Sequence, residues 1–475
     1  MIFLRLIPIV FAGAWQAFAQ SNIASNPPQR VVTLSVGASN AQGMPVTDLR
    51  PADLQVREDG KPRPIVFFRF TGSQRSSASP APGEFANHRE PTPTVILLDR
   101  LNDDLRAAAA ASNGISAVLQ RMASVDRVYI YVLTNIGELF PVQPLPSAEP
   151  DSQPVRDPTA AELRTRFDNA VRKLNGLRDG DNRVNGINRA NKTLQLLDAL
   201  FSQMGSLPGR KNLIWVTGAN YWAPAVDDIP SEVRGWSAAA FDSEIAVFTV
   251  DQSASAGAFL SDPNFVILRS LSAATGGVWY PANEVEPAFA DAIADARSSY
   301  TVAYYSSTPE NGKEPKIRID SARKGIRVRL LSRAGDAAQA GQLDADVLEN
   351  TAFDDQLRSS IDAAEIGLRV GVSRSPGSAH FTIHIDPADV FIEPTRSNYQ
   401  VHLTVLLAPY SDGFEAPPML VHVDINLTPA ALNKASKDGI VVTRDASWND
   451  KVLKMRVIVF DRGLHGIGSV TIPAN

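Results

Sequence analysis

Acidic, amide and hydroxyl side chains follow four apolar runs in the middle of the chain. These side chains are Asp99 to Asp103 after 94–98, Thr134 and Asn135 after 128–133, Thr217 after 212–216, and Asp251 after 245–250. If the runs are neighbouring parallel strands, their polar ends meet at one edge of a sheet, where open α/β sheets bind ligands. Two kinds of chemistry suit this edge. It can bind a ligand, or a pair of carboxylates, Asp99 with Asp251 or Asp179, can hydrolyse a polymer.

Other catalytic groups are scarce in this part of the chain. The 475 residues include no cysteine, which excludes disulfides, thiolate metal sites and cysteine nucleophiles. The six histidines all lie outside 94–306, at His88, His380, His384, His402, His422 and His465. An imidazole base is therefore missing from the segment, and it contains no nucleophile-elbow, zinc-protease or phosphate-loop motif. We expect a protein that is not an enzyme.

Strands and helices alternate between residues 94 and 306. Short apolar runs predict buried strands at 94–98, 128–133, 212–216, 245–250, 278–280 and 301–305. The stretches between them predict helices at 104–122, 160–175, 192–204, 263–274 and 284–296. This alternation predicts an α/β domain whose mostly parallel sheet has helices on both faces.

Regions of β-type pattern flank this domain. Residues 20–72 alternate as short strands around an Asp-Gly turn and predict an N-terminal β unit, and the Ser- and Pro-rich segment 73–93 predicts a linker. Residues 307–335 predict a basic β-hairpin, whose charges contact an anionic surface, face solvent, or pair with an acidic connector at 336–365. Residues 366–475 predict an antiparallel β-sandwich.

Composition and the N-terminus indicate a folded, exported protein. With 44% hydrophobic and 20% charged residues and a net charge of −5, the chain suits about three globular domains and no nucleic-acid partner. Residues 1–19 carry one base, an apolar run and an Ala-Phe-Ala pattern, which predict a signal peptide cleaved after Ala19. The mature protein is then periplasmic or secreted. No later segment is apolar over the length that a membrane span needs.

Four segments together resemble a known family. They are PVTDLRPADLQVREDGKP at 45–62, LLDRLN at 97–102, LPGRKNLIW at 207–215 and SSYTVAYY at 298–305. The combination resembles the secreted bacterial proteins related to von Willebrand factor type A domains, a family abundant in acidobacteria. The resemblance covers about residues 31–335. It implies that 94–306 is a Rossmann-like type A domain.

The resemblance also implies a possible metal site. Type A domains that bind Mg²⁺ use a D-x-S-x-S motif, a threonine from a middle loop and a later aspartate. Asp99 matches the leading aspartate, Leu101 and Asp103 replace the two serines, and Thr217 stands in place of the late aspartate. The middle threonine would fall within 179–193.

Two interpretations of these positions stay open. One is a remodelled site for Mg²⁺ or another divalent cation, which prefers oxygen ligands. Its ligands would be Asp99, Asn102, Asp103 and Thr217. The other is a degenerate site in which Asp99 caps the following helix. Leu101 has no atom that can bind a metal, which favours the degenerate site.

The sequence thus predicts an exported, non-enzymatic binding or scaffold protein whose type A domain contacts another protein or a surface polymer. Trp222 and Trp236 flank the loop after 212–216 and are expected to be exposed near the polar edge, whereas Trp215 and Trp279 are expected in the core. Two other classes stay open: a carboxylate-dependent extracytoplasmic hydrolase and a structural component of the envelope. The sequence sets no oligomeric state.

Overall fold

The structure, a computed structural model, describes most of the chain after residue 30. The described residues are 31–42, 44–72, 81–103, 105–122, 125, 127–146, 158–176, 186–218, 235–240, 243–253, 263–282, 284–307, 315–334, 345–359, 361–411 and 417–474. The signal peptide expected at 1–19 lies outside them. Within the described residues, no helix has both the length and the apolar character needed to cross a bilayer.

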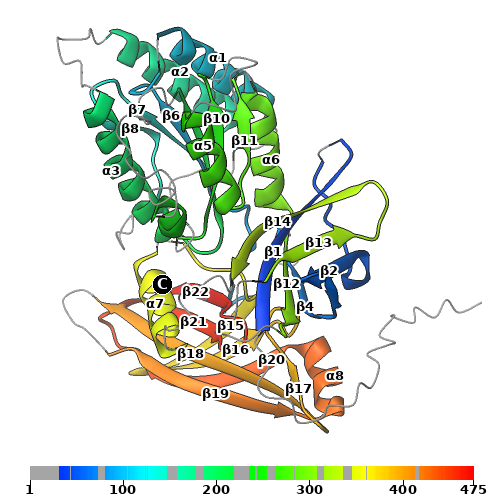
Figure 1. Cartoon of the computed structure of the whole chain (residues 1–475). Helices are drawn as coiled ribbons and strands as arrows, with labels where there is room; N and C mark the ends of the chain where they lie inside the picture. Colours follow the sequence, from blue (N-terminus) through cyan, green and yellow to red (C-terminus); the bar gives the residue numbers. More distant parts are fainter. Residues whose placement is uncertain are drawn as a thin grey trace, which may run out of the picture.

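A six-stranded sheet forms the centre of the α/β unit (Figure 1). Its strands are β6 (Thr94–Asp99), β7 (Val128–Leu133), β8 (Leu139–Gln143), β9 (Lys211–Thr217), β10 (Ile245–Asp251) and β11 (Trp279–Pro281). Their spatial order is β11-β10-β9-β6-β7-β8, and every pairing is parallel except that of β8 with β7. Numbered along the chain, this is the order 3-2-1-4-5-6 of a doubly wound sheet with an antiparallel third strand.

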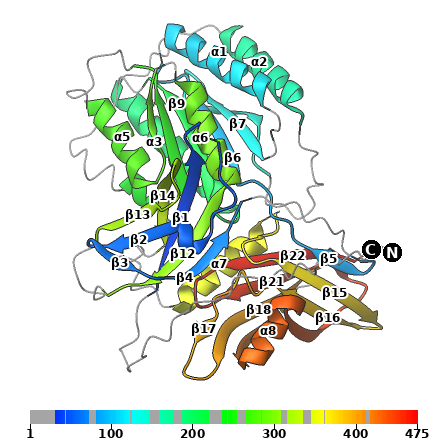
Figure 2. The ribbon, with the colours of Figure 1, turned by 90° about the vertical axis from the view of Figure 1, so that its right-hand side faces the viewer.

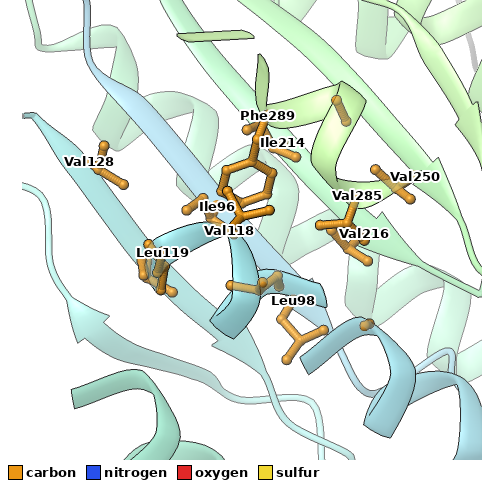
Figure 3. Close-up of a cluster of buried hydrophobic side chains, with 14 of the residues drawn as sticks. Ile96, Leu98, Val118, Leu119, Val128, Ile214, Val216, Val250, Val285 and Phe289 are labelled. Atoms are coloured by element: carbon orange, nitrogen blue, oxygen red, sulfur yellow. The ribbon is translucent and has the colours of Figure 1, made fainter. Parts of the chain in front are cut away.

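Helices pack on both faces of this sheet. One face is covered by α1 (Leu105–Arg121), α2 (Ala160–Gly176) and α6 (Val285–Arg297), and the other by α3 (Gly186–Gly205) and α5 (Pro263–Ala274). Ile96 and Ile214 pack with Phe289 of α6 on the first face (Figure 3). Leu97 packs on the second face. Both faces are buried, which explains why these strands are continuous apolar runs in the sequence.

A separate β unit combines the N-terminal strands with strands from after the α/β unit. Its elements are β1 (Val31–Asn40), a 3₁₀ turn at Pro51–Asp53, β2 (Leu54–Glu58), β3 (Lys61–Arg63), β4 (Ile65–Phe70), β12 (Ser299–Tyr305), β13 (Ile317–Ser321) and β14 (Ile326–Ala334). They form two sheets, β14-β1-β12-β4 and β13-β2-β3. The hairpin expected at 307–335 is thus divided between these two sheets.

Strand β12 corrects one expectation from the sequence. Residues 301–305 were expected to close the α/β domain, but β12 pairs with β1 and β4 and with no described strand of the six-stranded sheet. Tyr300, Val302 and Tyr304 face the core of the β unit, and Ala303 packs on the other side with Phe67. The α/β unit is therefore an insertion between two strands of one sheet.

The C-terminal part consists of two antiparallel sheets that share a core. One sheet contains β5 (Glu84–Ala86), β15 (Leu368–Ser375), β16 (Ser378–Ile385) and β20 (Ile440–Ser447). The other contains β17 (Glu393–Pro394), β18 (Tyr399–Ser411), β19 (Met419–Leu427), β21 (Val452–Asp461) and β22 (Ile467–Pro473). Phe381 and Ile383 of the first sheet share a buried cluster with Leu403 and Val457 of the second. Figure 2 shows these sheets on the opposite side of the molecule from α1 and α2, with α8 (Pro429–Asp438) beside them.

Part of the expected linker 73–93 belongs to this sandwich. Strand β5 pairs with β15, so residues 84–86 form an edge strand. The amide group of Asn87 donates to the carbonyls of Ala363 (2.7 Å) and Ile366 (2.9 Å) and its oxygen accepts the N–H of Leu368 (2.8 Å). A three-residue strand has too little pattern to be recognised in the sequence.

The acidic connector contains helix α7 (Ala345–Arg358), which packs on β21 rather than on the basic hairpin. Asp362, after α7, pairs with Arg456 of β21 at 3.1 Å. Three arginines of the hairpin have other partners: Arg318 pairs with Asp320, Arg323 with Asp48, and Arg329 with Asp295. Of the three alternatives for the hairpin, pairing with the connector is therefore not seen for these arginines in the described part of the chain.

Candidate functional site

The candidate site lies where the strand order of the parallel sheet reverses. Asp99 is the last residue of β6 and Thr217 is the last residue of the neighbouring strand β9. From β6 the chain continues to β7 on one side, and from β9 it continues to β10 on the other. Doubly wound sheets bind ligands at this switch point. We call residues 99–103, 134–137 and 217–218 the switch-point rim.

Asp99 accepts hydrogen bonds from five donors at this point. Its Oδ1 accepts the backbone N–H groups of Leu101 (3.0 Å) and Asn102 (3.1 Å). Its Oδ2 accepts the side-chain amide of Asn102 (2.7 Å), the hydroxyl of Thr217 (2.8 Å) and the indole N–H of Trp215 (3.3 Å). A carboxylate has about four lone-pair sites. The hydrogen-bonding capacity of Asp99 is therefore filled from within the protein.

Burial and these donors act on Asp99 in opposite directions. The side chain is fully buried, and loss of hydration raises the pKa of its carboxyl group. The hydrogen bonds from Asn102, Thr217 and Trp215 favour the charged form and limit that rise in pKa. Five donors directed at one carboxyl group suit the ionised form, because a protonated oxygen would have to donate. Asp99 is thus a buried acceptor, with no oxygen left to act as an acid or a base.

The expected helix cap takes a different form. The backbone N–H groups that Asp99 accepts belong to residues 101 and 102, whereas helix α1 begins at Leu105. Within the described residues, Asp99 thus stabilises the turn that leads into α1, rather than the first amides of α1 itself. Leu101 packs in the apolar cluster on the α3 side of the sheet, at 2% exposure, and offers no polar group to the rim.

Asn102 connects the turn after β6 to helix α3. Its amino group donates to Asp99 and also to the hydroxyl of Thr193 at 2.8 Å. The hydroxyl of Thr193 in turn donates to the backbone carbonyl of Arg189 at 2.9 Å. The order of donors and acceptors is fixed, since a carboxylate and a carbonyl can only accept. Thr193 lies in the range 179–193 where the resemblance places a middle threonine.

The loop after β9 approaches the loop after β6 closely. A Cβ atom on Gly218 would lie 2.5 Å from Oδ1 of Asp103 and 2.8 Å from the carbonyl of Asn102, so this approach needs glycine. Asp251, the last residue of β10, directs its Oδ1 to the hydroxyl (2.6 Å) and the N–H (3.0 Å) of Ser253. Asp103 thus lies beside Gly218 at the rim, while the carboxylate of Asp251 has its own partners.

The expectations about the residues around the rim have mixed outcomes. Trp236 is 9% exposed and packs in the cluster with Trp215, so the expectation that it is exposed near the rim was wrong. Its ring covers apolar helix and sheet side chains, which explains its burial. Trp222 and Asp179 lie outside the described residues. Trp215 is buried as expected, and its indole N–H contacts Asp99, which the sequence did not indicate.

Neither a scan against protein-family models nor a search of curated proteins finds a match. The fold and the contacts at the rim are therefore what indicates the function of this chain.

Proposed function

We propose that this protein is an exported, non-enzymatic binding protein with a von Willebrand type A domain, whose switch-point rim contacts another protein or a surface polymer. The strand order 3-2-1-4-5-6, with its antiparallel third strand and helices on both faces, supports the type A assignment that the sequence resemblance implies. The family relationship is part of the proposal.

The position of the rim, at the opposite end of the parallel strands from the connections to the β modules, supports the binding role. The α/β unit joins the rest of the chain at Thr94, where β6 begins, and at Arg297, where α6 ends, beside the amino ends of the parallel strands. The N–H of Thr92 donates to the carbonyl of Ala296 at 3.1 Å, so the two connections lie side by side. The rim lies at the other end of strands about 20 Å long. It is therefore presented on the side facing away from the β modules.

The contacts of Asp99 favour binding over hydrolysis. Glycoside hydrolysis by two carboxylates needs both groups to face the substrate, one as an acid and one as a base or nucleophile. Both oxygens of Asp99 accept hydrogen bonds within the protein, and Asp251 is bonded to Ser253. These contacts support a site whose side chains hold the loops in shape, rather than one that transfers protons.

Ile136 is a suitable place to test contact at the rim. It lies in the loop between β7 and β8 and is 50% exposed. The loop adjoins the turn after β6, because the N–H of Arg100 donates to the carbonyl of Leu133 at 2.8 Å. Since the chain has no cysteine, an Ile136→Cys variant carries a single thiol for a photo-crosslinker. Leu453→Cys on the sandwich, 52% exposed, is the matched control.

The labelled proteins are added to the extracytoplasmic fraction of the source cells and illuminated. We expect a crosslinked product of defined mass from position 136, reduced by an excess of unlabelled protein, and no such product from position 453. Equal products from both positions, or a product from 453 alone, would contradict the proposed contact surface. A product that unlabelled protein does not reduce would indicate a permanent structural assembly instead.

A further inference from the structure

The type A resemblance implies a divalent cation at the switch-point rim, and the donor set there can be tested against one. Mg²⁺ and related ions need several oxygen atoms directed at one point. Asp99 is surrounded instead by hydrogen-bond donors: two backbone N–H groups, an indole N–H, a hydroxyl and an amide. Leu101, at the position of the first motif serine, is buried in the apolar core. The surroundings of Asp99 therefore do not suit a cation.

The amino group of Asn102 joins Asp99 to Thr193, which lies in the range where the resemblance expects a middle threonine. It lies 2.7 Å from Oδ2 of Asp99 and 2.8 Å from Oγ1 of Thr193, so each of its two protons has an acceptor. The hydroxyl of Thr193 must be the acceptor of the hydrogen bond from Asn102, because it donates its own proton to the carbonyl of Arg189. The nitrogen and the oxygen of the Asn102 amide are nearly the same in shape, so it is this chain of hydrogen bonds that identifies the atom facing Asp99 and Thr193 as the nitrogen.

A cation bound to Oδ2 of Asp99 could enter only by breaking this arrangement. It would have to displace the amino group of Asn102, which would then turn away from both of its acceptors. It would also compete with the hydroxyl of Thr217 and the indole of Trp215 for the oxygen Oδ2 of Asp99. Buried donors without acceptors are costly, so the protein would lose several bonds in exchange for the metal.

We infer that the side-chain amide of Asn102 takes the place of a divalent cation at this rim, so that the carboxyl end of the sheet holds its shape without a metal ion. The amide supplies two N–H bonds in fixed directions where a metal would supply two metal–oxygen bonds. It ties the turn after β6 to helix α3, as a bridging ion would. The inference does not depend on the proposed partner, since it concerns only the bonds within this chain.

The test compares cation binding and stability in the full mature protein and in an Asn102→Asp variant. Aspartate has nearly the same shape but no amino protons, and it places a second carboxylate beside Asp99. Titration calorimetry with MgCl₂, MnCl₂ and CaCl₂ measures binding, and thermal unfolding is followed in EDTA and in each salt. Asn102→Ala controls for loss of the side chain without added charge.

We expect no saturable cation binding by the parent protein and the same unfolding midpoint in EDTA as in each salt. In EDTA, Asn102→Asp and Asn102→Ala should both unfold about 3–8 °C below the parent. Saturable addition of Mn²⁺ or Mg²⁺ should restore Asn102→Asp and leave Asn102→Ala unchanged. Cation binding by the parent that Asp99→Asn abolishes would overturn the inference, and this titration requires no folded Asn102 variant. Parent-like stability of both Asn102 variants in EDTA, or failure of cations to restore Asn102→Asp, would also overturn it.

Discussion

The hydroxyl of Thr217 donates a 2.8 Å hydrogen bond to the carboxylate of Asp99, joining the ends of two neighbouring parallel strands at the point where the strand order reverses. Both side chains are fully buried. Doubly wound sheets usually leave room for a ligand here. In this protein a side-chain contact closes the space directly between β6 and β9, so the proposed partner would contact the loops around it.

Replacing Asp99 should destabilise the α/β unit strongly. Asp99→Ala leaves five donors without their acceptor, and we expect a loss of about 3–5 kcal/mol. Thr217→Val removes one donor and should cost about 1 kcal/mol. Denaturant titrations followed by tryptophan fluorescence measure both, because the indole of Trp215 contacts Asp99. A loss below about 1 kcal/mol for Asp99→Ala would show that these bonds do not hold the rim.

A pair of glycines with the same backbone conformation tests how the α/β unit is seated on the β unit. Gly276 (φ 76°) and Gly325 (φ 77°) both lie in the left-handed region. A Cβ atom on Gly276 would lie 1.5 Å from the carbonyl oxygen of Leu331 in β14, whereas none of the neighbouring atoms lies within 4 Å of one on Gly325. Gly325→Ala should cost about 1–2 kcal/mol from strain alone.

Gly276→Ala adds a backbone collision to that strain, and should cost more than about 3 kcal/mol or prevent folding. Urea unfolding of the two variants gives the comparison. Equal losses would mean that the loop after α5 does not depend on its contact with β14.

Asp461 should make the stability of the sandwich depend on pH. It is 1% exposed, and burial raises its pKa to about 6, although the N–H groups of Phe391 and Gly463 favour its charged form. The folded pKa exceeds the unfolded value, so the folded protein binds more protons between about pH 4 and 6. Stability should therefore increase by about 2–3 kcal/mol as the pH falls from 7 to 4.

The measurement is the difference between the parent and Asp461→Asn across that pH range. His465, in the same turn, has a pKa lowered by burial and contributes the opposite slope below about pH 6.5, so the parent curve alone is not sufficient. The variant should lose the rise in stability that Asp461 contributes. Exposed Asp450→Asn serves as the surface control, and parallel curves for parent and Asp461→Asn would contradict the prediction.

Asn87 should hold strand β5 on the sandwich. Its side chain makes three hydrogen bonds to residues 363–368. Asn87→Ala should weaken this attachment by about 2–3 kcal/mol. Hydrogen exchange of residues 84–86 should then become at least tenfold faster, while exchange in β21 stays the same. Asn87→Asp, which retains only the acceptor, should give an intermediate rate, and unchanged exchange in both variants would rule out this role.

The elements of the α/β unit could be predicted from the sequence because its strands are buried on both faces. The runs 128–133 and 245–250 match β7 and β10 within one residue, and 263–274 matches α5. The pattern does not indicate which sheet a strand joins. Strand β12 is also buried on both faces, so its apolar pattern resembles that of a parallel strand although its neighbours are β1 and β4.

The rim could be located from the sequence, but its contacts could not. Strand ends place Asp99 and Thr217 at one edge because their strands are adjacent in an alternating α/β pattern. The bond from Asn102 to Thr193 joins residues 91 positions apart, on a loop and on a helix of different orientation. Neither the hydrophobic periodicity nor the spacing of residues can predict a contact between side chains so far apart in the sequence.

The insertion of the α/β unit between β4 and β12 has a mechanical consequence. A domain on a single linker can rotate freely, whereas the α/β unit is connected to the rest of the chain at two points. Helix α6 passes into β12 with only Ser298 between them. The N–H of Thr71 donates to the carbonyl of Ser299 at 2.8 Å, which fixes the end of β4 beside that exit. A torque applied at the rim is therefore transmitted through α6 to the strands of the sheet β14-β1-β12-β4, with no flexible hinge between α6 and β12.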